Sequence, residues 1–106
     1  MPKYLLQVSY TNDGVKGLRK EGGTSRRAAA EQLVKSMGGS MEAFYFAFGE
    51  YDAVTIIEMP DAASMSAAAL AIAASGAVTG KTTVLISPED VDVAVKKTPT
   101  YRAPGQ

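Results

Sequence analysis

The sequence predicts an α+β domain in which one four-stranded antiparallel sheet carries its helices on a single face. Three observations lead to this fold class. Residues 41–59 are typical of a β-hairpin, with an aromatic first arm and a β-branched second arm. Alternating apolar and polar residues predict strands at 4–10 and 78–87. Helix start and stop signals around apolar or alanine-rich runs predict helices at 24–37 and 61–75.

The first predicted strand has one apolar face and one face that mixes apolar and polar residues. The segment that follows it, 12–23, contains four glycines, which lower helix propensity. We therefore expect an ordered loop there, with at most a weak helical turn. Thr24 or Ser25 is expected to cap the first proper helix, and Gly38-Gly39 is expected to end it.

The central hairpin is predicted to turn at Gly49-Glu50-Tyr51-Asp52, before the second arm Val54–Ile57. The glycine would supply a positive φ angle, and the aspartate would accept hydrogen bonds from the backbone amides of its own turn. Phe44, Phe46 and Phe48 share one parity of the first arm, so they are expected on one face of the sheet.

Clear local signals mark the second half of the chain. Asp61 is the expected N-cap of the alanine-rich helix. Ser87-Pro88, followed by acidic residues, predicts a short helix to about residue 97 after the last strand. The two prolines of residues 98–106 predict a loose tail or an arm onto a neighbouring subunit. We expect one domain over 1–97 and a C-terminal tail over 98–106.

The predicted order β-α-β-β-α-β is the split βαβ arrangement of the ferredoxin-like fold. In this topology the hairpin turn lies at the end of the sheet where the first strand exits. The loop 11–23 and the connection around Ala77 arrive at the same end. A pocket is expected to open among these three connections.

The strand faces predict self-association. Two helices cover only one face of a four-stranded sheet, and the other face is too apolar for water and too polar for a dry core. A second subunit packed across a partly wet cavity would suit it, so we expect a homo-oligomer, a dimer or higher. Which parity faces the helices is left open. One parity contains Leu6, Val8, Phe44, Phe46, Phe48, Val54 and Ile56, and the other contains Gln7, Ser9, Tyr45, Ala47, Thr55, Ile57, Lys81 and Leu85.

Composition narrows the function classes. Eleven basic residues balance eleven acidic ones, so no global field favours nucleic acid or an anionic membrane. The chain has no cysteine and no histidine, which removes thiolate catalysis, the commonest general base and the commonest metal ligand. We expect no metal and no cofactor. No apolar run is long enough to span a bilayer and no signal peptide is evident, so a cytoplasmic protein is expected.

Two segments carry a family resemblance. The runs FYFAFGEYDAV and YLLQVSYTNDGVKGLRK resemble the GYD-domain family, which is named for its Gly-x-Tyr-Asp turn. The resemblance covers most of the chain. It implies a ferredoxin-like fold of the dimeric α/β-barrel type, and it does not itself imply a catalytic role for any residue of the turn.

The candidate site residues cluster at the predicted loop end. Asp52 could act as a base or anchor, Tyr51 could donate to an oxyanion, and Glu50 could bind a cation or a second proton. A purely structural turn explains the same residues. Tyr10, Thr11 and Lys16 could complete such a pocket, with the lysine neutralising a carboxylate or phosphate. The predicted ligand-binding set is Tyr10, Thr11, Lys16, Tyr45, Gly49, Glu50, Tyr51 and Asp52.

A second, weaker signal is the basic cluster Arg19-Lys20 and Arg26-Arg27, which could grip an anion near the helix start or simply be solvated.

Two functions from different classes follow. The first is a non-enzymatic homo-oligomer that binds a small metabolite at the loop end of the sheet or at the subunit interface. The alternative is a cofactor-independent enzyme, monooxygenase-like or isomerase-like. There, Tyr45 or Tyr51 would donate to a developing oxyanion, and Asp52 or Glu50 would take the proton.

Overall fold

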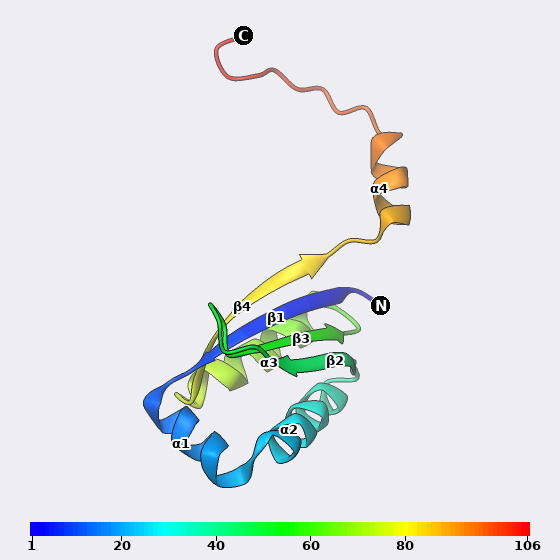
Figure 1. The fold of residues 1–106 in the computed structure, drawn as a ribbon. Coiled ribbons are helices and arrows are strands. Elements are labelled where there is room, and N and C mark those ends of the chain that lie inside the picture. The colour runs from blue at the N-terminus through cyan, green and yellow to red at the C-terminus, as the bar shows by residue number, and fades with distance from the viewer.

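The computed structural model describes residues 1–106 and contains one sheet and four helices (Figure 1). The sheet has the order β2-β3-β1-β4, and every neighbouring pair is antiparallel. This confirms the predicted ferredoxin-like arrangement, except that two helices make the first crossover. The elements are β1 (Lys3–Tyr10), α1 (Asn12–Glu21), α2 (Gly23–Ser36), β2 (Ser40–Phe46), β3 (Ala53–Glu58), α3 (Ala62–Ala74), β4 (Val78–Leu85) and α4 (Pro88–Val95).

The helix starts in the second half of the chain lie where their capping residues predict. The Asp61 carboxylate accepts a hydrogen bond from the Ser64 backbone N–H at 2.7 Å and so caps α3. That hydrogen bond also holds the pKa of Asp61 below its usual value. The Ser87 hydroxyl accepts from the Asp90 backbone N–H at 3.1 Å and caps α4.

The prediction of a loop over 12–23 is wrong, because α1 is a full helix. The Thr11 hydroxyl accepts from the Gly14 backbone N–H at 3.2 Å, which supplies the cap that offsets the poor helix propensity of glycine. Packing against β1 and α2 supplies the rest. Gly22, with φ 85°, separates the two helices and stands at the N-cap of α2, so neither Thr24 nor Ser25 caps that helix.

The hairpin connection is longer than predicted and runs over residues 47–52. Phe48 lies outside the strand and stacks on Phe46, with ring centroids 5.7 Å apart. Phe48, not Gly49, takes the positive φ angle, at 53°. The Asp52 carboxylate also does not bond to its own turn, because it reaches the backbone of Tyr10 instead. The turn is therefore shaped by its contacts with β1 rather than by its glycine.

Strand register settles which side chains face the helices. Tyr4 pairs with Ile57, and Leu6 pairs with Thr55, so these side chains share one face. The predicted parity groups were wrong for β3, because a register set by distant pairing cannot be read from one strand alone. The helix-covered face and the helices form the core. Its buried members are Tyr4, Val34, Ile57, Met59, Met65 and Ala68, with a smaller cluster of Leu6, Val8 and Ala53.

The opposite side of the sheet, which we call the open face, is covered by no part of the chain. Its side chains follow from the register: Leu5, Gln7, Tyr45, Val54, Ile56 and Lys81. Leu5, Val54 and Ile56 are half-buried, and Tyr45 is 71% exposed. An apolar strip therefore runs across the middle strands with polar groups around it.

After β4 the chain leaves the domain. Residues 86–106, which we call the C-terminal arm, contain α4 and the final extended segment, and all of them are exposed. Figure 1 shows this arm projecting beyond the end of β4, away from the other helices. The radius of gyration is 16.9 Å, against about 13 Å for a compact chain of this length. None of the helices is both long and apolar enough to cross a membrane.

Candidate functional site

Three connections meet at the end of the sheet where β1 exits. The Asp52 carboxylate accepts from the Tyr10 backbone N–H at 2.8 Å. The Thr11 backbone N–H donates to the Ala77 carbonyl at 2.9 Å, and its hydroxyl donates to the Gly76 carbonyl at 2.9 Å. The hairpin connection, the start of α1 and the α3–β4 connection are thereby tied together.

The structure brings only some of the predicted ligand-binding residues together. Tyr10, Thr11 and Asp52 lie together, because the Asp52 carboxylate bonds to the Tyr10 backbone. Tyr51, which precedes Asp52 in the chain, is half-buried. The others are exposed: Lys16 on α1, Gly49 and Glu50 in the hairpin connection, and Tyr45 on the open face. Asp52 is half-buried and serves to hold β1 against the hairpin connection. No group of three or more acidic side chains is placed to hold a metal ion.

A cavity lies elsewhere, between the sheet and its three covering helices. Its volume is about 490 Å³, and it is lined mostly by hydrophobic side chains. The cavity exists because α2 packs along β2 while α3 packs along β4, so the two helices do not close on each other. Small side chains, among them Ala30, Ala68 and Ala71, widen the gap. Of the predicted site residues, only Tyr10 lines this cavity.

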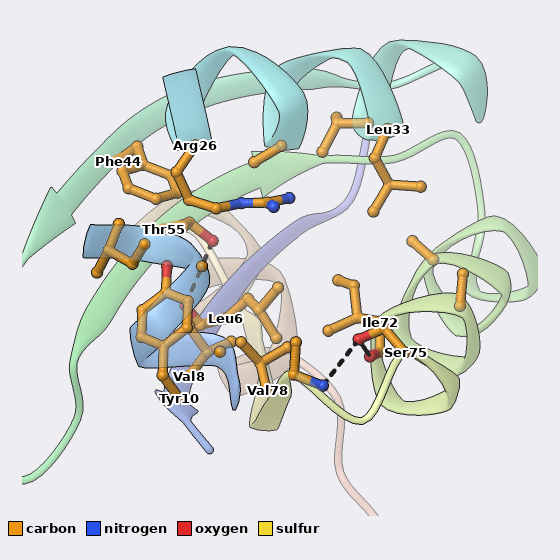
Figure 2. A pocket seen from close by; sticks show the side chains of 18 of the residues that line it. Leu6, Val8, Tyr10, Arg26, Leu33, Phe44, Thr55, Ile72, Ser75 and Val78 are labelled. Atoms are coloured by element: carbon orange, nitrogen blue, oxygen red, sulfur yellow. Dashed lines mark hydrogen bonds between the residues drawn. The ribbon is translucent and has the colours of Figure 1, made fainter. Parts of the chain in front are cut away.

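Two oppositely charged side chains of the cavity lining lie close together. Arg26, in the first turn of α2, lines it, and Figure 2 shows the guanidinium reaching over the cavity while the Tyr10 ring rises from β1. Glu21, at the end of α1, also lines the cavity and lies 3.8 Å from the guanidinium. Asp13 is the remaining charged residue of the lining. We call Tyr10, Glu21 and Arg26, which interact electrostatically, the cavity mouth.

The Tyr10 hydroxyl is protonated at neutral pH. Burial raises the pKa of Tyr10 above its ordinary value of 10.0, and the nearby positive charge of Arg26 opposes this shift. The negative charges of Asp52 and Glu21 add to it. No hydrogen bond engages the hydroxyl within the chain, so it is free to donate to a bound group.

The other polar groups of the lining are already engaged. The Thr55 hydroxyl donates to the Leu6 carbonyl at 3.3 Å. The Ser75 hydroxyl donates to the Ile72 carbonyl at 2.6 Å and accepts from the Ala77 backbone N–H at 3.2 Å. Recognition of a polar group in the cavity therefore falls to its mouth.

Sequence reasoning found the mouth only in part. Arg26 was included in a basic cluster, but the structure separates it from Arg19, Lys20 and Arg27, which do not line the cavity. Glu21 had no distinguishing signal of its own. The useful signal was the pair of opposite charges on either side of Gly22-Gly23, because a sharp bend between two helices brings residues on its two arms together.

Comparison with known proteins gives one family and one relative. Residues 4–95 match the model of the GYD domain. A protein from Thermus thermophilus, named "Glutamine synthetase and cystathionine beta-lyase binding protein", is 30% identical over 96 residues, which span 91% of this chain and all of the relative. No solved structure matches the chain.

Proposed function

Because the chain belongs to the GYD domain family, we propose that it is a non-catalytic binding protein that works as a homo-oligomer and recognises a metabolic enzyme. We also propose a cytoplasmic location. The observation that carries the proposal is the C-terminal arm, which contacts little of its own domain and exposes apolar side chains.

The arm has the properties of a docking helix. Val91, Ala94 and Val95 of α4 follow the i, i+3, i+4 spacing that gathers side chains on one side of a helix. Val91 is 49% exposed and Val95 is 73% exposed. Short amphipathic helices of this kind bind by laying their apolar side in a groove of a partner. We therefore propose that α4 binds in a groove on the partner enzyme.

The open face supplies the second surface. Leu5, Val54 and Ile56 form an apolar strip that no helix of the chain covers. Contiguous exposed apolar surface on a small protein marks an interface. We assign this face to a second copy of the chain, which would bury the strip against its equivalent in a dimer or a higher assembly.

The partner class follows from the relative. That protein is named for binding glutamine synthetase and cystathionine β-lyase, and the match covers all of that protein and 91% of this chain. We propose that this chain likewise binds glutamine synthetase, cystathionine β-lyase or both.

This proposal predicts that the chain co-sediments with glutamine synthetase or cystathionine β-lyase from its own organism in sedimentation velocity. A Val91→Asp/Val95→Asp variant should bind at least about tenfold more weakly, because a carboxylate would be buried unpaired in the groove. The matched control is Val93→Asp, on the other side of α4, which should bind nearly as the parent does.

Two results would contradict the assignment. One is the absence of co-sedimentation with either enzyme. The other is dissociation of the chain's own oligomer in the Val91→Asp/Val95→Asp variant, which would place α4 on a second copy instead of on an enzyme.

Binding of a small metabolite is a second candidate function, and the cavity favours it. The site would lie between the sheet and the helices, next to the predicted loop end, and Tyr10 belongs to both. The enzyme alternative has less support, because the Asp52 carboxylate is engaged with the Tyr10 backbone and lies outside the cavity. A mass spectrum of the native protein, compared with that of the denatured chain, would reveal a co-purified ligand.

A further inference from the structure

We propose that the cavity binds an apolar α-amino acid, with its side chain inside the cavity, its carboxylate on Arg26 and its ammonium group on Glu21. The inference rests on the small-molecule part of the proposed function and adds the chemical class of the ligand.

The interior of the cavity favours an apolar ligand side chain. Leu6, Ile57 and Ile72 are among the many hydrophobic side chains that line it. The hydroxyls of Thr55 and Ser75 are occupied by backbone partners. A volume of about 490 Å³ lies within the usual range of roughly 300–1,000 Å³ for small-molecule sites. A branched aliphatic or aromatic side chain therefore fits the interior in both polarity and size.

The charges of the cavity mouth favour a zwitterionic ligand. It presents one cation, Arg26, next to one carboxylate, Glu21. A simple carboxylate ligand would meet the like charge of Glu21 there, and a simple amine would meet the guanidinium. An α-amino acid carries both charged groups on one carbon atom, so each can face its opposite at once.

The spacing of the mouth residues leaves them available to a ligand. The Arg26 guanidinium and the Glu21 carboxylate are 3.8 Å apart, which is longer than a charge-assisted hydrogen bond. Each therefore keeps its hydrogen-bonding capacity for a third group. The Tyr10 hydroxyl, protonated and without a partner, adds one donor for the ligand carboxylate.

Three ligands with the same indole body separate the two charges. L-Tryptophan has both, tryptamine lacks the carboxylate, and indole-3-propionate lacks the ammonium group. The chain contains no tryptophan, so the indole fluorescence of each ligand reports its binding directly. We expect saturable binding of tryptophan at one site per chain, on the order of tenfold tighter than either analogue.

Two substitutions assign the charges to residues. Arg26→Gln should weaken tryptophan and indole-3-propionate on the order of tenfold and leave tryptamine unchanged. Glu21→Gln should weaken tryptophan and tryptamine and leave indole-3-propionate unchanged. Arg19→Gln removes the same charge as Arg26→Gln from an exposed position on α1 outside the cavity, and should change none of the three affinities.

The possible failures are distinct. If none of the three ligands binds, the inference is overturned, while a co-purified ligand in the native mass spectrum would still support small-molecule binding of another class. If tryptamine or indole-3-propionate binds as tightly as tryptophan, the cavity binds small molecules but not as a zwitterion site. If Arg19→Gln acts like Arg26→Gln, the effect is one of overall charge and the assignment to Arg26 is wrong.

Discussion

Ile57→Ala is expected to lower the free energy of unfolding by about 2–5 kcal/mol. Ile57 is 1% exposed and lies in the main core cluster, on the helix-covered side of the sheet. Truncation removes buried methyl and methylene groups, and the cavity next to the site limits how far the neighbours can close around the gap. Urea denaturation monitored by circular dichroism measures the change.

The neighbouring Ile56 provides the matched control, because the alternation of β3 places its side chain on the open face. Ile56→Ala should cost the isolated subunit much less. Its main effect should be on self-association, which we expect to weaken on the order of tenfold. Equal destabilisation by the two substitutions, with no change in assembly, would mean that the face assignment of β3 is wrong.

Gly14→Ala is expected to destabilise the protein by about 1–3 kcal/mol. A Cβ atom at this buried position of α1 would collide with the carbonyl oxygen of Ala77 and crowd the Tyr10 ring. Backbone atoms cannot move aside as a flexible side chain can, so α1 or the α3–β4 connection must shift. Thermal unfolding of the variant should show a clearly lowered midpoint.

Gly17→Ala, one helical turn further along α1, tests the same helix without the close approach. Its added Cβ would meet no atom within 4 Å, so alanine should stabilise the protein by about 0.4–1 kcal/mol through its lower entropy in the unfolded chain. Opposite signs for the two substitutions would support the packing of α1 described above. A stabilising Gly14→Ala would contradict it.

Some features of the fold could be predicted from the sequence alone, and others could not. The caps at Asp61 and Ser87 were predictable because a cap is a local contact between residues three positions apart. The order of elements and the family were predictable for a similar reason, since hairpin, strand and helix signals are local. The formation of α1 was not predicted, because its packing outweighs the propensity of its glycines.

The site was harder to predict than the fold. Tyr10 was identified from its position at the end of the first strand, and the meeting of three connections around it followed from topology. The cavity depends on the separation of α2 from α3, and the place of Arg26 at its mouth depends on the bend at Gly22. Both are consequences of tertiary packing, which no single segment encodes.

The central claim is that this chain works as a homo-oligomer whose open face is buried against a second copy. Native mass spectrometry of the full chain tests it most directly. We expect a mass of two or more times the 11.1 kDa of the single chain, shifting toward one chain in Ile56→Ala. A mass of one chain at every concentration, for the unaltered protein, would contradict the account.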